Sequence, residues 1–252
     1  MSAAAQNGGA AASAAGGLPI LTAAYLQAHK VGTQGKDVIW GPLYDSAAYP
    51  SAGGVAFSFF NAGIGAGTSS APGAGAVGKT LYDTNIKTPN MLTMGLEFYA
   101  IGSETHFLPG VQNTVGTPYA LLPGRGAIAP AKTGDFVNDV WAVLNGGLKT
   151  LTVGTDRNYI QDGPLMQFPP AKWLHVQAAL SEIGPSSTST GVGNEIAYAC
   201  AGGEPYLLVP IYLQSNQMFS LAIGFAAAIA TPSGDPGRLI ERLRGYLIRQ
   251  VT

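Results

Sequence analysis

Residues 140–153 read VWAVLNGGLKTLTV, and this stretch carries the sharpest local signal in the chain. Two largely apolar runs, WAVL and LKTLTV, flank an Asn-Gly-Gly loop at 145–147, and Asn and Gly tolerate the positive φ angles of tight turns. The pattern predicts a β-hairpin over residues 140–153. In its second run, alternate residues from Leu148 face one way and those from Lys149 the other, so neither face is cleanly apolar. We therefore expect protein to cover the outer face of this sheet as well.

Similar short apolar runs lie on both sides of this stretch. After Gly35, short apolar or alternating runs are divided by Gly, Pro, Asn and Asp, which is typical of an all-β domain. A spacing of about 8 to 12 residues between several runs favours a sandwich or barrel. We predict strands at 37–44, 54–61, 92–103, 137–144, 148–154, 158–161, 174–180, 195–201, 206–214, 219–225 and 243–251.

The chain divides into an arm over residues 1–35 and one domain over residues 36–252. Residues 1–17 are mostly Ala, Gly and Ser, too poor in large side chains to order alone, and residues 18–30 have the apolar spacing of a short amphipathic helix. Two glycine-rich loops at 62–78 and 110–133 are long enough that we expect them at contacts between subunits. The bland segment at 184–193 is predicted to be an exposed tip.

The composition points to a chain that is covered by neighbouring molecules. Charged residues make up 11% of the 252 residues, against roughly 25% in an average soluble domain. Obligate interfaces resemble a domain core cut in half, so we expect much of this surface to be buried in an assembly. The net charge of −1 provides no bulk attraction to nucleic acid or an anionic bilayer.

No targeting or membrane segment is evident in the sequence. No run approaches the roughly 18 to 20 consecutive apolar residues of a spanning helix. Residues 1–17 lack both the basic start and the apolar segment of a secretory signal. We expect the protein to be made and used in the cytosol.

The segment GAGAVGKT at 73–80 matches the phosphate-binding pattern G-x-x-x-x-G-K-[ST]. A working phosphate-binding loop follows a buried strand and opens a helix, so that backbone N–H groups meet the phosphates. Here a Pro precedes the segment, and Asp83, Asn85 and Pro89 oppose a following helix. With 35 glycines in the chain, we interpret the match as coincidence and expect no nucleotide cofactor. The run GIGAG at 63–67 likewise lacks the remaining elements of a dinucleotide fingerprint.

Other catalytic and metal-binding patterns are missing. The single Cys200 excludes an intrachain disulfide, and His29, His106 and His175 have no recognisable ligand neighbour at metal-site spacing. No G-x-S-x-G nucleophile elbow exists, and the sparse acidic residues form no predictable pair. We expect no enzymatic activity, no catalytic residue, no cofactor, no metal and no soluble small-molecule substrate.

Two groups of residues are candidates for a structural role. Large aromatic residues are candidate anchors of the core or of an interface. Four arginines near the end of the chain have two interpretations. The simpler one is a solvated or salt-bridged face. The functional one is an inner basic patch that contacts packaged nucleic acid or lipid headgroups. The anchors are Phe57, Phe59, Phe60, Trp141, Phe168 and Trp173, and the arginines are Arg238, Arg242, Arg244 and Arg249.

The order of the apolar segments carries a family resemblance over most of residues 37–251. The relevant segments are GGVAFSFFNAGIG at 53–65, KTLYDTNIKTPNML at 79–92, EFYAIGSETHFLPG at 97–110, LNGGLKTLTVGTDRNYIQDGPLMQFPP at 144–170 and VPIYLQSNQMFSLAI at 209–223. In this order the chain resembles the jelly-roll capsid proteins of tailless icosahedral bacteriophages, which often contain a membrane. The resemblance implies a β-sandwich of two four-stranded sheets, extended termini that tie capsomers together and no enzymatic activity. A single jelly roll is favoured over a double one, because about eleven strands are too few for sixteen.

The expected function is therefore that of a structural capsid protein that self-assembles into an icosahedral virion shell. Its expected partners are copies of itself, in a trimer or larger capsomer, together with other capsid proteins, and an internal membrane or the packaged genome as further candidates. It is expected in the virion after assembly in the host cytoplasm. The alternative is a receptor- or carbohydrate-binding β-sandwich of a virion spike, with Tyr and Trp on its loops.

Overall fold

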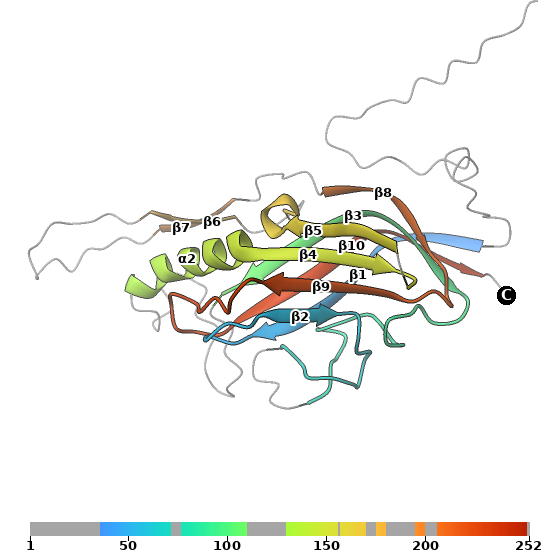
Figure 1. The fold of residues 1–252 in the computed structure, drawn as a ribbon, viewed down its shortest axis with the longest axis horizontal. Helices are drawn as coiled ribbons and strands as arrows, with labels where there is room; N and C mark the ends of the chain where they lie inside the picture. Colours follow the sequence, from blue (N-terminus) through green and yellow to red (C-terminus); the bar gives the residue numbers. More distant parts are fainter. Residues whose placement is uncertain are drawn as a thin grey trace, which may run out of the picture.

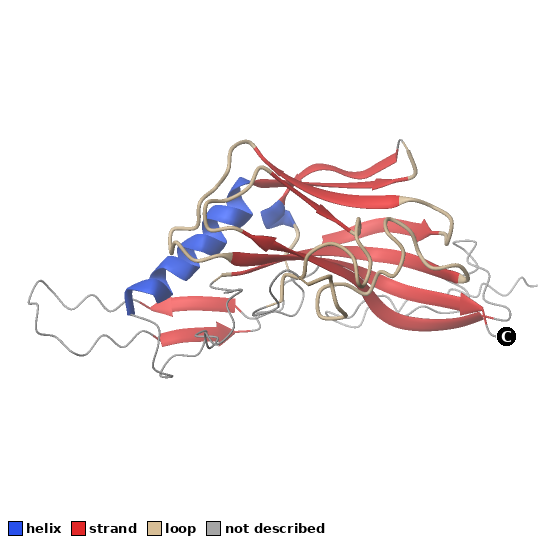
Figure 2. Cartoon of the chain, turned by 90° about the horizontal axis from the view of Figure 1, so that it is seen from below, coloured by secondary structure: helices blue, strands red, loops and turns tan. Residues whose placement is uncertain are grey.

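The computed structural model describes residues 36–71, 77–109, 130–155, 157–169, 175–179, 195–199 and 206–250. These residues form a predominantly β structure whose two four-stranded antiparallel sheets pack face to face as a sandwich (Figures 1 and 2). The predicted arm at 1–35, the tip at 184–193 and all of the predicted loop at 110–133 before Pro130 lie outside the described residues.

Sheet A has the strand order β1-β10-β3-β8, and sheet B has the order β2-β9-β4-β5. A separate two-stranded sheet, β6-β7, lies beside the helix α2 at one end of the sandwich (Figure 2). The elements are β1 (Lys36–Tyr49), β2 (Ala56–Phe59), β3 (Leu96–Leu108), α2 (Pro130–Gly146), β4 (Gly147–Val153), β5 (Arg157–Pro164), the short 3-10 helix η1 (Leu165–Gln167), β6 (His175–Ala179), β7 (Glu195–Ala199), β8 (Tyr206–Leu213), β9 (Phe219–Phe225) and β10 (Gly237–Gln250).

The core lies between the sheets and follows from the two-residue period of the strands. In β9, Phe219, Leu221, Ile223 and Phe225 point inward and are buried, while the residues between them are exposed. β4 alternates in the same way, as predicted, with its series from Lys149 turned inward. Each large apolar side chain buried here contributes about 1.5–3 kcal/mol relative to exposure, so the sheets hold together mainly through this layer.

The predicted hairpin at 140–153 is wrong in its first half, because Pro130–Gly146 is a helix. Val143 is buried, and Val140 and Leu144 pack on the same core, which is the three- and four-residue spacing of a helix face. Trp141 lies away from that core and is 56% exposed. β-branched and aromatic composition favoured a strand, but the spacing of the apolar residues favours the helix. The helix also takes in residues 130–133, the end of the predicted second loop.

The other predicted strands are present with shifted ends. The predicted strand at 219–225 has the bounds of β9, whereas β10 begins at Gly237 rather than at residue 243, and β1 and β3 extend further toward their C-terminal ends. The missed portions contain buried polar residues such as Asp45, Thr105 and Glu241. These interrupted the apolar pattern on which the prediction depended. No helix in the described part of the chain is long and apolar enough to cross a membrane.

Candidate functional site

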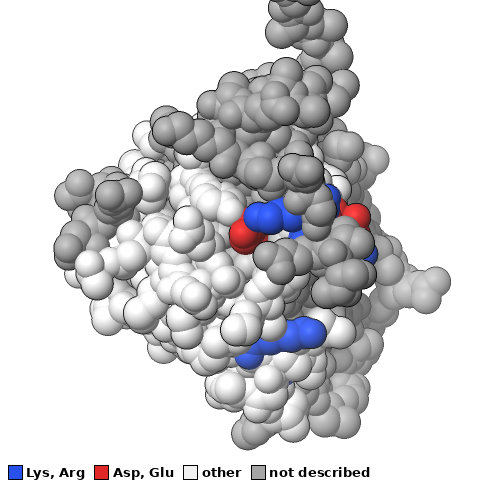
Figure 3. Space-filling view, turned by 90° about the vertical axis from the view of Figure 1, so that its right-hand side faces the viewer, with Lys and Arg blue, Asp and Glu red and all other residues white. Residues whose placement is uncertain are grey.

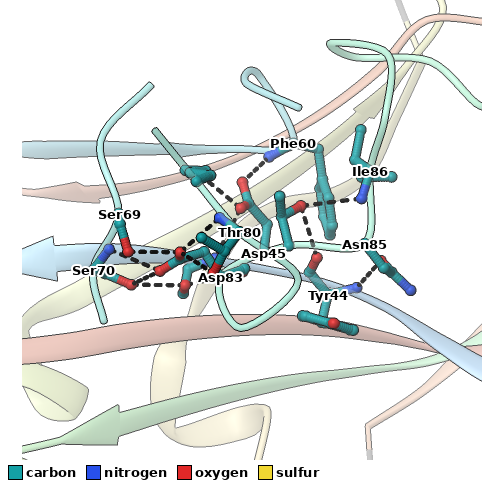
Figure 4. Close-up of polar contacts among 12 residues, drawn as sticks. Tyr44, Asp45, Phe60, Ser69, Ser70, Thr80, Asp83, Asn85 and Ile86 are labelled. Carbon is teal, nitrogen blue, oxygen red and sulfur yellow. Dashed lines mark hydrogen bonds and ion pairs between the residues drawn. The ribbon is translucent and has the colours of Figure 1, made fainter. Parts of the chain in front are cut away.

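The long loop between β2 and β3 is anchored by the carboxylate of Asp83, which is fully buried (Figure 4). One oxygen accepts hydrogen bonds from the backbone and hydroxyl of Ser70, at 2.8 and 2.9 Å. The other accepts from the Ser69 hydroxyl at 2.7 Å and from the Thr80 backbone at 2.9 Å. Burial alone would raise the pKa of Asp83, but these hydrogen bonds lower it below its ordinary value. The described parts of the loop are therefore fixed to one another at a single ionised side chain.

Arg238 of β10 connects this loop to sheet A. Its guanidinium donates to the hydroxyls of Ser70 and Ser46, at 2.8 and 2.9 Å, and to the Tyr82 carbonyl at 2.7 Å. It lies 3.7 Å from Asp83 and stacks over the Tyr82 ring. A buried guanidinium with this many partners acts as a fixed structural joint.

Lys79, the lysine of the phosphate-binding pattern, is buried in an ion pair. Its Nζ lies 2.6 Å from Asp45 Oδ1, and Asp45 Oδ2 accepts the backbone N–H of Phe60 at 2.5 Å. Phe60 has a φ of 64°, a left-handed conformation that costs a bulky residue roughly 1–3 kcal/mol and persists only where surrounding contacts hold it. Burial raises the pKa of Asp45, against the lowering effect of Lys79. In place of the helix of a phosphate-binding loop, a turn follows Thr80.

The edge of β1 is covered by one side-chain amide (Figure 4). Asn85 donates through Nδ2 to the Pro42 carbonyl at 2.8 Å and accepts the Tyr44 N–H at 3.0 Å. Its own backbone N–H donates to the Tyr44 carbonyl at 3.3 Å. An amide with one donor and one acceptor replaces the partner strand here, so this stretch of edge is not available for pairing.

The two sheets are joined inside the core by Lys149 of β4 and Glu241 of β10, both fully buried. Lys149 Nζ lies 2.5 Å from Glu241 Oε2 and donates to the Thr105 hydroxyl at 2.8 Å. That hydroxyl donates to Glu241 Oε1 at 2.7 Å. The Lys149 ammonium also lies 4.4 Å from the centre of the Phe168 ring. Burial lowers the pKa of Lys149 and raises that of Glu241, so the apolar surroundings favour the neutral form of each.

Sequence reasoning missed this inter-sheet cluster of Lys149, Glu241 and Thr105, although a signal for it existed. Lys149 lies on the same side of its strand as the apolar Leu151 and Val153. Glu241 likewise lies on the same side of its strand as Leu239 and Leu243. A charged residue at an inward position of two different strands indicates a buried pair, but only once the two strands are known to face each other.

Each of the four arginines lies beside an acidic side chain, and Arg238 is buried rather than part of a solvated face. Arg242 and Arg244 lie 3.8 and 2.9 Å from the buried Glu104, and Arg249 lies 3.0 Å from Asp37. Glu104 also contacts the buried His106 at 3.2 Å, where burial lowers the histidine pKa below 6.5. With Arg238 beside Asp83, each arginine has an acidic partner, which reduces its attraction for phosphate.

The six aromatic candidates divide between core and surface. Phe59, Phe60 and Phe168 are buried in the core, and Phe57 packs against it, stacked on Tyr49 with ring centres 5.1 Å apart. Trp141 is exposed on α2 and stays a candidate interface anchor. Trp173 lies outside the described residues.

The outer face of sheet B is uncharged over β2, β4 and β9. Its outward side chains are small or aliphatic, and none of them is ionisable. An antiparallel sheet with one solvated face ordinarily alternates apolar with polar or charged residues; this face keeps the alternation, but its polar members are only Ser and Thr. The outward residues are Ala56, Ser58, Leu148, Thr150, Thr152, Ser220, Ala222 and Gly224.

The end of the sandwich where β4 ends and β9 begins is also poor in charge. Figure 3 shows mostly neutral side chains there, with charged ones confined to small groups. Met94 is 83% exposed just before β3, and Met218 is 54% exposed just before β9. Flexible methionines at a surface suit contacts with another protein.

Several charged side chains are buried, and the described residues include no group of three His, Cys, Asp or Glu that could hold a metal ion. Comparisons with protein families, curated proteins and solved structures find no match. The candidate functional site is the outer face of β2, β9 and β4 in sheet B; of the buried polar clusters, the one of Lys149, Glu241 and Thr105 lies on the inner side of this sheet.

Proposed function

We propose that this chain is a structural subunit of a self-assembling shell, a capsid protein with a single jelly-roll fold. Leaving out the β6-β7 hairpin, the remaining eight strands pair from the two ends of the chain inward: β1 with β10, β2 with β9, β3 with β8 and β4 with β5. Strands paired in this way form one long antiparallel ribbon. When the ribbon is rolled up, β10 comes to lie beside β3 and β9 beside β4, which are the two further pairings in the sheets. This order supports a jelly roll, an architecture common in viral shells.

The outer face of β2, β9 and β4, which has no ionisable side chain, is the observation that carries the assembly proposal. The chain has few charges, and several of them are inside, where they cannot make a surface soluble. The buried members in the described part are Asp45, Lys79, Asp83, Glu104, Asp139, Lys149, Arg238 and Glu241. A face of Ala, Gly, Ser, Thr and Leu has short side chains that permit close approach of another copy, and it has no charge to desolvate.

Size measurement of the purified chain tests this proposal. We expect sedimentation velocity and electron microscopy of the wild type to reveal large closed particles. Ala222→Glu places a charge at the centre of the outer face, and desolvating that charge at an interface costs several kcal/mol, so this variant should stay as small species. Ala227→Glu introduces the same side chain at an exposed position in the loop after β9 and should assemble normally.

The two variants also separate assembly from folding. Both should unfold at the wild-type temperature, because both positions are exposed. A wild type that stays a monomer or trimer at high concentration and binds glycans would instead favour the spike module. Equal assembly of Ala222→Glu and the wild type would exclude the outer face of sheet B as the contact.

A further inference from the structure

The contact between Lys149 and Glu241 does not have the geometry of an ordinary salt bridge. Nζ and Oε2 are only 2.5 Å apart, yet Oε2 receives no hydrogen bond of acceptable direction. In the described structure the Glu241 carboxyl group contacts two donors, the Lys149 ammonium beside Oε2 and the Thr105 hydroxyl on Oε1. It accepts no backbone N–H in that part of the structure, whereas a buried carboxylate is normally stabilised by several well-directed donors.

The Thr105 hydroxyl bridges the amine and the acid. It accepts from Lys149 Nζ at 2.8 Å and donates to Glu241 Oε1 at 2.7 Å. A proton can therefore pass from the nitrogen to the hydroxyl while the hydroxyl proton passes to the carboxyl oxygen. This places a nucleophile, a proton relay and a carbonyl carbon together in a site with no exposed atom of Lys149 or Glu241.

We propose that Lys149 and Glu241 form an intramolecular amide cross-link between sheets B and A. In the neutral pair, the Nζ lone pair attacks the Cδ carbon of the protonated Glu241 carboxyl group. Through Thr105 the nitrogen loses a proton and the departing carboxyl oxygen gains one. The C–N bond forms, the C–O bond breaks and one water leaves, so amine and acid give amide and water without an oxidant or cofactor.

The second buried pair, Lys79 and Asp45, lacks the arrangement that the cross-link needs. Lys79 donates a regular hydrogen bond to Asp45, whose two oxygens also accept the backbone N–H groups of Ser46 and Phe60. These donors counteract the effect of burial on Asp45 and favour its carboxylate, which is a poor electrophile, and in the described part of the structure no hydroxyl bridges Lys79 to Asp45. Lys79 is therefore the matched control for Lys149.

Peptide mapping of the unfolded wild-type protein tests the cross-link directly. Trypsin does not cut after an acylated lysine, so we expect one branched peptide in which residues 133–157 are joined to residues 239–242, lighter by one water than the two peptides together. Tandem mass spectrometry should place the branch at Lys149 and Glu241. Finding only linear peptides, with cleavage after Lys149, would overturn the proposal.

Variants test the assignment and the relay. Lys149→Met should abolish the branched peptide, whereas Lys79→Met should keep it. Thr105→Val keeps the size of the side chain but removes the hydroxyl, and should form the branched peptide about 100-fold more slowly after synthesis. A branch at Lys79, or an unchanged rate in Thr105→Val, would contradict the assigned residues or the relay. The readout is covalent mass, so it does not depend on whether the chain assembles.

Discussion

At the scale of single residues, the most informative side chains are the buried carboxylates of Asp45 and Asp83. Neither stands out in the sequence, because an isolated Asp in a strand or loop is ordinarily solvated. Each becomes a joint only when donors distant in sequence converge on it, as Lys79 and Phe60 do at Asp45. The sequence therefore predicted where the apolar core would form but not where the polar joints would lie.

Asp83→Asn should destabilise the fold and change its acid sensitivity. Losing an ionised acceptor with five hydrogen bonds and a nearby Arg238 should cost about 3–5 kcal/mol. The folded pKa of Asp83 lies below 3.8, so the carboxylate stabilises the fold fully above pH 3.8 and loses its effect as the pH falls through the folded pKa. Urea unfolding of both proteins should give curves that converge below pH 3.8. A difference in free energy of unfolding between the two proteins that stays constant down to the lowest pH measured would contradict this prediction.

At the scale of elements, strand positions were predictable because inward positions are mostly apolar with a two-residue period. The strand at 219–225 is an example, since its alternation is unbroken. The helix α2 was missed because Val and Trp have strand propensity, and only packing on the core decides between the two periods. The ends of β1 and β10 were missed where inward positions are Asp45 and Glu241, whose burial depends on lysines from other elements.

Asn85 provides an element-scale prediction at the edge of β1. Asn85→Ala removes two side-chain hydrogen bonds to the strand and should lower the free energy of unfolding by about 1–3 kcal/mol. It also uncovers an edge for pairing with other chains, so light scattering on mild heating should rise. Asn85→Asp keeps the acceptor for the Tyr44 N–H but has no donor for the Pro42 carbonyl. Its free energy of unfolding should lie between those of the wild type and Asn85→Ala. An alanine variant as stable as the wild type would show that the amide is dispensable.

At the scale of the whole molecule, sheet A is held together by its most distant parts. β10 lies between β1 and β3, and the pairing of Lys36 with Gln250 closes nearly the full length of the described chain. β1 pairs with no other strand in the described structure, so it has no place in sheet A until β10 is present. Such non-local pairing makes folding slow, in the range of milliseconds to seconds or longer for β-sandwiches.

Deleting residues 237–252 should therefore unfold the whole domain rather than remove one strand from an otherwise intact structure. β10 supplies Leu239 and Leu243 to the core and Arg238 and Glu241 to the polar clusters, so their loss removes packing and leaves Asp83 and Lys149 without their oppositely charged neighbours on this strand. We expect the truncated chain to lose cooperative thermal unfolding in calorimetry and to gain protease sensitivity throughout. Removing residues 1–17 is a deletion of similar length, which should retain the cooperative transition and impair only assembly. A chain without β10 that still unfolds cooperatively would mean that sheet B and its helix fold independently of sheet A.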